Sequence, residues 1–189
     1  LQNTYHLGET MTGAVMALDN VLAIFLLPVF GMLSDKVHTK LGRRMPFIVV
    51  GTILAVIFMM MLPMIDNAEK ARWVTGGSFS NQVFFLGVLF LTLVSMGLYR
   101  SPAVALMPDV TPNHLRSRAN AVINLMGAVG GVYALIMIKV LVGKGETPDY
   151  LPLFASIAAV MAIAVGILVI TIRENKLREE VEKAEAANA

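Results

Sequence analysis

The sequence predicts an all-α, polytopic membrane protein with five transmembrane helices, and three observations support this. Of the 189 residues, 57% are hydrophobic and only 15% are charged, whereas a soluble domain is about 45–50% apolar and about 25% charged. Five stretches are long and apolar enough to cross the hydrocarbon of a bilayer, which takes about 20 helical residues. Positive charges also gather in alternate connections between these stretches.

The five predicted spans share an almost complete lack of ionisable side chains. Asp19 is the one acid within them, and Lys139 lies near an end of the fourth. A soluble helical bundle would show a charged face at every third or fourth residue, and a membrane barrel would alternate polar and apolar residues over about ten. The sequence has neither pattern. The predicted spans are residues 10–30, 47–65, 83–99, 119–142 and 151–172.

Lysine and arginine predict the orientation. Eleven of the fifteen lie in the first connection, the third connection and the tail after residue 172. Cytoplasmic loops carry an excess of positive charge, so these three segments are expected inside the cell and the N-terminus outside it. Residues 1–172 would then be part of one multi-pass domain in the plasma membrane, and residues 173–189 a polar cytoplasmic linker or tail.

The first connection carries a distinctive pattern of glycine and charge, with G-M-L-S-D at residues 31–35 and G-R-R-M-P-F at 42–47. Glycine allows close backbone approach or a positive φ. An aspartate can cap or pair at a helix end, and arginines can donate to carboxylates or to helix-end carbonyls. By itself, this pattern also fits a simple positively charged turn on the cytoplasmic side.

Together with a second block, this pattern resembles the major facilitator superfamily. Gly-x-Leu-Ser-Asp followed by Gly-Arg-Arg resembles the loop between helices two and three, and the ending Gly-Arg-Arg-x-Pro-Phe resembles the glycoside–pentoside–hexuronide:cation symporter and sucrose-transporter-like branches. Residues 99–112 and 116–121 resemble the loop between helices four and five of the same branches. The resemblance implies helices two to six of a twelve-helix protein, so that the first helix of the N-terminal six-helix bundle and the C-terminal half are missing.

The resemblance also implies a conformational latch, in which charged contacts at the cytoplasmic face hold the outward-open state. Asp35 and either Arg43 or Arg44 would make those contacts, with further charged residues as local partners. Taken on its residues alone, Arg100 at the end of the third span is expected to snorkel or to pair at the cytoplasmic rim rather than to bind sugar. The implied latch residues are Gly31, Asp35, Gly42, Arg43, Arg44, Arg100 and Asp109.

Asp19 lies about midway along the first span, where an acid costs several kcal/mol unless it faces protein or water. It is therefore predicted, together with Asn20, to lie on the path of a solute or an ion. The alternative is a protonated or hydrogen-bonded aspartate buried against a neighbouring helix. Symporters of the melibiose type are expected to carry paired acids on this helix, so the Asp-Asn pair favours H⁺ over Na⁺ coupling.

Asn120, Asn124, Gly127 and Gly131 are predicted to share one face of the fourth span, because their spacing follows the helical period. The two glycines permit close packing against another helix. The two amides would either hydrogen-bond across that contact or face a solvent-lined pathway.

No catalytic, cofactor or metal-binding pattern occurs in the sequence. There is no cysteine, the three histidines lie in separate polar segments, and no phosphate-binding glycine loop is present. A net charge of +2 is too small to indicate a nucleic-acid partner. We therefore expect a protein that is not an enzyme and that holds neither a cofactor nor a metal.

The expected function is that of a fragment of a secondary active transporter. It would carry a sugar or glycoside together with H⁺ or Na⁺ by alternating access. Its partners would be the lipid bilayer, the solute, the coupling cation and the missing half of the transporter. Two alternatives stay open at this point: a facilitator or exporter of another small solute, and a membrane scaffold subunit that does not transport.

Overall fold

The computed structural model describes residues 9–187 apart from residues 40, 74–78 and 143–147. The described secondary structure is helical, with one isolated bridge between Thr39 and Gly42, which confirms the predicted class. The elements in chain order are α2 (Glu9–Lys36), α3 (Met45–Trp73), α4 (Phe79–Val110), η1 (Asn113–Leu115), α5 (Arg116–Leu141), α6 (Leu151–Thr171) and α7 (Glu174–Ala187).

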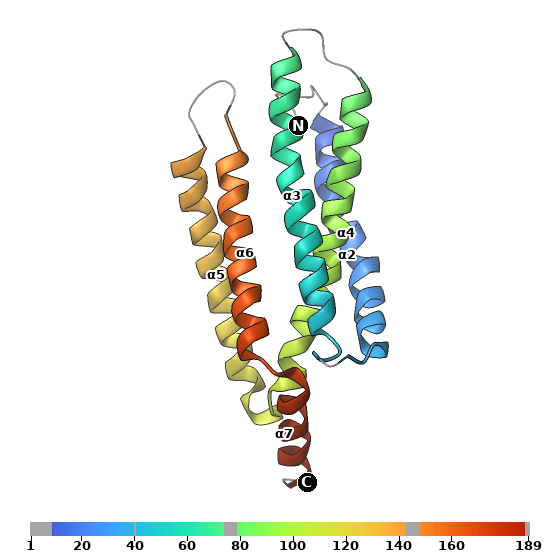
Figure 1. The fold of residues 1–189 in the computed structure, drawn as a ribbon, viewed down its shortest axis with the longest axis vertical. Coiled ribbons are helices and arrows are strands. Elements are labelled where there is room, and N and C mark those ends of the chain that lie inside the picture. Colours follow the sequence, from blue (N-terminus) through green and yellow to red (C-terminus); the bar gives the residue numbers. More distant parts are fainter. Residues whose placement is uncertain (1–8, 40, 74–78, 143–147, 188–189) are drawn as a thin grey trace.

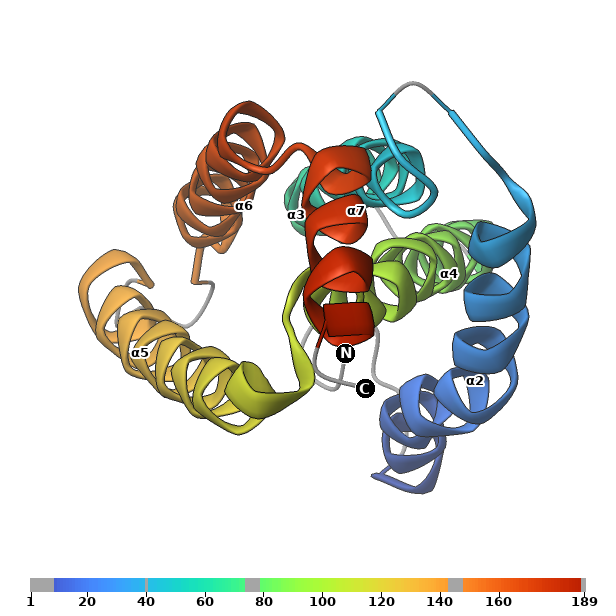
Figure 2. The same ribbon diagram turned by 90° about the horizontal axis from the view of Figure 1, so that it is seen from below.

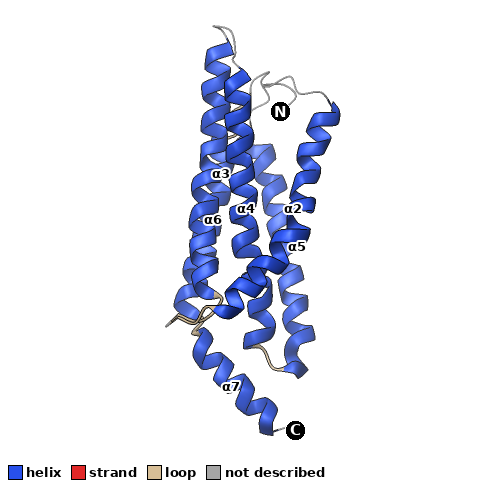
Figure 3. Cartoon of the chain, turned by 90° about the vertical axis from the view of Figure 1, so that its right-hand side faces the viewer, coloured by secondary structure: helices blue, strands red, loops and turns tan. Residues whose placement is uncertain are grey.

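Helices α2 to α6 run roughly alongside one another, and α7 projects beyond one end of the bundle (Figures 1 and 3). Seen along the bundle, α2, α4 and α3 form one group and α5 and α6 another, with α6 beside α3 (Figure 2). The packing agrees with this view, because α3 contacts chiefly α4 and α6, and α2 contacts α4.

Three of the predicted spans lie within a helix, and the fourth and fifth extend one residue beyond the ends of α5 and α6. Within the described part of the chain, four helices are long and apolar enough to cross a membrane, over residues Met45–Ala68, Val83–Val110, Asn113–Leu141 and Leu151–Thr171. The first predicted span coincides with α2, which is 28 residues long and contains Pro28. Judged on its described residues, α2 is not one of these four candidate membrane-spanning helices.

The helix that contains the third predicted span runs beyond it. The span was placed at residues 83–99, and residues 99–112 were likened to a loop between two helices. The structure continues α4 to Val110 with Pro102 and Pro108 inside the helix. A proline leaves the carbonyl four residues earlier without its helical partner, but packing compensates here: Pro102 is fully buried. The true connection to α5 begins only after residue 110.

The buried apolar core lies where α3, α4 and α6 meet at one end of the bundle. Met45 and Ile48 of α3 pack with Leu106 of α4, and apolar side chains of α6 cover them. By contrast, none of the described side chains of α5 is buried. In a membrane protein an exposed apolar helix face meets lipid or other helices, so such exposure is not an instability.

Candidate functional site: a charged cluster at one end of the bundle

Glu174 connects the start of α7 to the start of α3. Its side chain is fully buried, and its two carboxylate oxygens accept the backbone N–H groups of Arg43 (2.8 Å), Arg44 (3.2 and 3.1 Å) and Met45 (3.1 Å). The first N–H groups of a helix have no partner within it, and the helix dipole favours a negative charge there. Glu174 thus caps α3 from about 130 residues away in the sequence.

Gly42 makes this contact possible. Its φ is +124°, a conformation that side-chain-bearing residues rarely adopt. The turn is closed by reciprocal backbone hydrogen bonds between Thr39 and Gly42 (3.2 and 3.1 Å), and the Thr39 hydroxyl also donates to the Gly42 carbonyl (2.6 Å). A Cβ on Gly42 would collide with the Glu174 carboxylate.

Arg44 joins the ends of three helices. Its Nε lies 2.6 Å from Oδ2 of Asp109, in the last turn of α4, and its Nη2 lies 3.1 Å from Oδ1 of Asp35, in the last turn of α2. Arg43 also approaches Asp109, at 3.6 Å. An acid near a helix C-terminus is unfavourable beside the negative end of the dipole, so the Arg44 guanidinium offsets a repulsion that both aspartates experience.

The two ion pairs of Arg44 differ in burial. The side chains of Arg44 and Asp109 are 9% and 20% exposed, whereas that of Asp35 is 51% exposed. Water and salt therefore weaken the Asp35 pair more than the Asp109 pair. We call Asp35, Arg43, Arg44, Asp109 and Glu174 the charged cluster.

Small residues bring α2 and α4 together next to the charged cluster. Ser101 of α4 donates from its hydroxyl to the Leu27 carbonyl of α2 (2.7 Å), whereas Ser34 donates to the Gly31 carbonyl within α2 (2.8 Å). A Cβ on Gly31 would lie 3.2 Å from the Ser101 hydroxyl. Gly31 therefore keeps α2 close to α4, which is a packing role.

The structure does not bring every predicted site residue to this cluster. Arg100 lies ten residues before the end of α4, is exposed, and forms no ion pair with Asp35 or Asp109. Asp19 and Asn20 lie on α2, where Asn20 is exposed and the side chain of Asp19 is outside the described part of the structure.

The predicted face of α5 is open. Asn120 and Asn124 are exposed, and no described atom outside the neighbouring backbone of α5 lies within 4 Å of the position that a Cβ would take on Gly127 or Gly131. Within the part of the chain that the structure describes, no group of three or more His, Asp or Glu side chains is placed to hold a metal ion.

Sequence reasoning missed Glu174. The available signal was its position, because it is the first acid after the last apolar span and follows it by two residues. A lone glutamate at the start of a polar tail does not reveal which helix it faces. Only the packing of α6 against α3 brings Glu174 to the N-terminus of α3.

A second carboxylate joins α3 and α6 at the opposite end of the bundle. Oδ1 of Asp149 accepts from the Asn67 side-chain amide (2.8 Å) and from the backbone N–H of Leu151 (2.9 Å). Asp149 thus caps α6 and also contacts α3. Asp149 therefore links α3 and α6 at one end of the bundle, and Glu174, which follows α6 closely in the chain, links them at the other.

Comparison with known proteins decides the family. The model of the Major Facilitator Superfamily matches residues 1–189. The chain belongs to the Major Facilitator Superfamily. Superfamily proteins are transporters and not enzymes, in agreement with the absence of catalytic patterns noted above. No solved structure gives a significant match to this chain.

Relatives within the superfamily include plant sucrose transporters. The chain is 26% identical to "Sucrose transport protein SUT3" of Oryza sativa subsp. japonica and 28% identical to "Sucrose transport protein SUC3" of Arabidopsis thaliana, each over 137 residues and 68% of this chain. It is 35% identical to "Sucrose transport protein SUC4" of Arabidopsis thaliana over 117 residues, 58% of this chain. These alignments cover 27%, 23% and 22% of the three relatives, so the chain spans about a quarter of their length.

Proposed function

We propose that the chain forms helices two to six of a secondary active transporter that carries a sugar or glycoside with a cation, H⁺ or Na⁺, by alternating access. The charged cluster is the observation that carries this proposal, because it joins the ends of α2, α3, α4 and α7 through Arg44 and Glu174. The similarity to sucrose transport proteins supports a sugar as the solute. The charged end would face the cytoplasm of a plasma-membrane protein, and the N-terminus of the chain would lie outside.

The cluster would act as a two-state contact. Ion pairs that are partly shielded from water bias the packing in which they form, and a transporter must leave that packing to expose its site to the other side. In the proposed cycle the Arg44–Asp109 pair contributes most to this bias because it is the less exposed pair. Asp35 and Arg43 contribute less.

The remaining predicted residues have proposed roles along the pathway. Asp19, with Asn20 beside it, would bind the coupling ion or the solute, because an acid within a span is usually retained for function. Asn120 and Asn124 would face the pathway or the helices that the open side of α5 meets in the whole protein. Gly127 and Gly131 would let those helices approach α5 closely.

Uptake by the whole protein tests this proposal. Radiolabelled sucrose would be supplied to vesicles that contain the full-length protein, with a pH gradient and a Na⁺ gradient imposed separately. We expect gradient-driven uptake that Asp19→Asn abolishes while the amount of protein in the membrane is unchanged. Two results together would favour a scaffold subunit instead. The protein would show no uptake under any gradient, and Asp19→Asn would alter only assembly or stability.

A further inference from the structure

Two prolines in α2 and α4 lie at equal distances before the two aspartates that Arg44 contacts. Pro28 precedes Asp35 by seven residues in α2. Pro102 precedes Asp109 by the same number in α4, and seven residues of helix rise about 10 Å. Both helices run toward the end of the bundle that holds the charged cluster (Figure 1). Each of the two carboxylates is thus carried on two helical turns that begin at a proline.

A proline inside a helix makes the helix easier to bend at that turn. It lacks the N–H that would bond to the carbonyl four residues earlier, and its ring crowds that carbonyl. Sharp kinks of more than about 20° therefore occur almost always at a proline or at a few other interruptions of the helix. Pro28 is the only proline in α2. Bending of α2 is therefore expected at residues 24–28.

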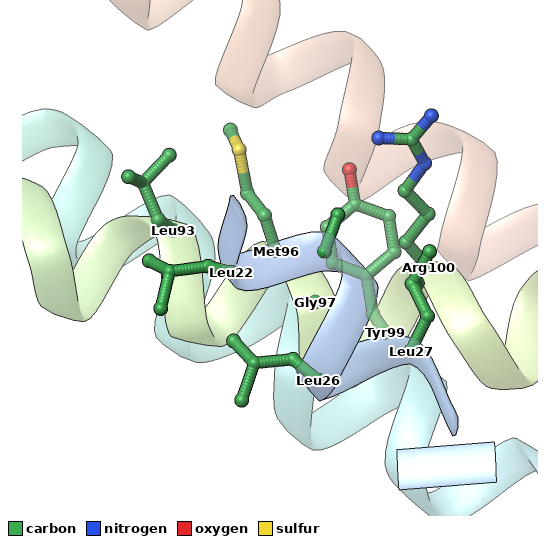
Figure 4. Close-up of a pocket in the computed structure, with 9 residues that line it drawn as sticks. Leu22, Leu26, Leu27, Leu93, Met96, Gly97, Tyr99 and Arg100 are labelled. Carbon is green, nitrogen blue, oxygen red and sulfur yellow. The ribbon is translucent and has the colours of Figure 1, made fainter. Parts of the chain in front are cut away.

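A hydrogen bond and a close contact join α2 to α4 next to Pro28. The Ser101 hydroxyl donates to the carbonyl of Leu27 (2.7 Å), the residue before the proline. A Cβ on Gly97 would lie 3.4 Å from Cβ of Leu26, and Figure 4 shows Leu26 and Leu27 of α2 beside Gly97 of α4. At the turn where α2 bends, it is therefore also attached to α4.

The inner end of α4 is held from several sides, although it too contains prolines. Pro102 is fully buried, and Leu106 packs in the core with side chains of α3. Arg116 at the start of α5 donates to the backbone carbonyls of Pro108 (3.1 Å) and Thr111 (3.3 Å). These contacts fix the two turns that carry Asp109, so the proline does not free them to move.

The inner end of α2 is attached more weakly, and we call its residues 29–36 the α2 arm. Asp35 reaches Arg44 through an ion pair in which the side chain of the acid is 51% exposed, and exposed ion pairs are weak. Met32 and Leu33 of the α2 arm are also exposed. Ser34 is buried, but its hydroxyl donates within α2 and not to α4.

We propose that Pro28 is a hinge about which the α2 arm swings away from Arg44, while the Ser101–Leu27 hydrogen bond stays in place. The α2 arm is eight residues long, about 12 Å, so a change of about 20° at the hinge moves its tip by about 4 Å. That movement takes the Asp35 carboxylate out of hydrogen-bonding range of Arg44. The role of the hinge rests on the proposed transport function: the α2 arm is the first part of the charged cluster to open in the cycle.

Distances between spin labels in the full-length protein in nanodiscs test the hinge. Residues 1–189 contain no cysteine, so labels can be attached at chosen positions once any cysteine elsewhere is replaced by serine. One label pair joins Lys36, at the tip of the α2 arm, to Val50 of α3. The other joins Val21, on the opposite side of Pro28, to Val50. The three labelled side chains are exposed. Double electron–electron resonance gives the distribution of separations for each pair.

Asp35→Asn removes the charge that holds the tip of the α2 arm. We expect it to raise the ratio of displaced to closed arms by up to about fivefold, with the two populations differing by about 4 Å in the position of residue 36. The separation of Val21 and Val50 should not change. Adding Pro28→Ala restores the missing N–H and should keep the α2 arm closed. The matched control, Pro63→Ala, removes a proline from within α3 and should not keep the α2 arm closed.

Two results would overturn the hinge. Equal changes in both label pairs in Asp35→Asn would show that α2 moves as a whole. Unchanged separations in both pairs would show that other contacts, including those with helices outside this chain, hold the α2 arm. Thermal melting verifies that each variant is folded, and if Pro28→Ala does not fold, the comparison of the two pairs in Asp35→Asn decides alone. The predicted separations without any sucrose uptake would contradict the proposed transport function and leave the hinge standing.

Discussion

The carboxylate of Glu174 occupies the space beside Gly42 in which a side chain would lie. Gly42 is thus required for two independent reasons, its positive φ of +124° and the proximity of a buried acid. The arrangement fixes the start of α7 against the start of α3. It also places Arg44, two residues after Gly42, where its guanidinium reaches Asp35 and Asp109.

Gly42→Ala should destabilise the protein strongly. The positive φ alone costs on the order of 1–3 kcal/mol for a residue with a side chain, and the added methyl group must displace Glu174 from its hydrogen bonds. Thermal unfolding in detergent measures the change. Gly87→Ala is the matched control, because no described atom beyond the adjacent helix backbone lies within 4 Å of its added Cβ and alanine favours the helix. Equal melting temperatures for the two variants would contradict the proposed role of Gly42.

Glu174→Ala should destabilise the protein by about 1–3 kcal/mol, because it leaves three backbone N–H groups at the start of α3 without their acceptor. Glu174→Gln should also be destabilising, since its side-chain NH2 group replaces one of the accepting oxygens. That NH2 group donates hydrogen bonds and would face backbone N–H groups that also donate. Hydrogen exchange at residues 43–45 should rise in both variants. The control is Glu179→Ala, which removes an exposed acid of the same helix. Unchanged exchange at residues 43–45 in Glu174→Ala would show that the cap is dispensable.

The two aspartates that Arg44 contacts should differ in effect. Asp109→Asn removes the less exposed partner and should cost about 1–3 kcal/mol, whereas Asp35→Asn, with a half-exposed side chain, should cost less than about 1 kcal/mol. A double-mutant cycle with Arg44→Gln measures each coupling energy. A larger coupling to Asp35 than to Asp109 would reverse the order that the structure gives.

Asp149→Ala should cost about 0.5–2 kcal/mol because it removes the acceptor at the start of α6. Asn67→Ala should cost less, since it removes only the contact to α3 and the site is exposed. Chemical denaturation of each variant gives the two values. If Asn67→Ala lowered the free energy of unfolding more than Asp149→Ala does, the contact between α3 and α6 would stabilise this end of the bundle more than the cap of α6 does.

The fold could largely be predicted from the sequence, because a run of about 20 apolar residues has few alternatives to a membrane-spanning helix. The C-terminal end of α4 could not be predicted from the sequence. Pro102 and Pro108 normally argue for a turn, and only the tertiary packing of α4, with Pro102 buried, shows why they are tolerated within the helix. With the span ending at residue 99, Arg100 was expected at the rim, whereas the structure places it ten residues before the end of α4.

The charged cluster was predicted in part. The resemblance implied contacts of Asp35 with Arg43 or Arg44 in the first connection and made Asp109 of the second block a local partner, and the structure places Arg44 against both Asp35 and Asp109. Glu174 was missed, since its role depends on α6 packing beside α3, a long-range contact without a local signature. The close helix packing expected at Gly127 and Gly131 stays a prediction, because the described residues leave that face of α5 open.

The central claim is that the ion pair between Arg44 and Asp109 controls transport, and exchanging the two charges tests it most directly. Radiolabelled sucrose uptake would be measured for the full-length protein with Arg44→Asp, with Asp109→Arg and with both, at equal abundance in the membrane. We predict that each single variant loses at least about tenfold in uptake rate, which corresponds to about 1.4 kcal/mol, and that the double variant recovers part of it. Uptake at the wild-type rate by either single variant would contradict the account.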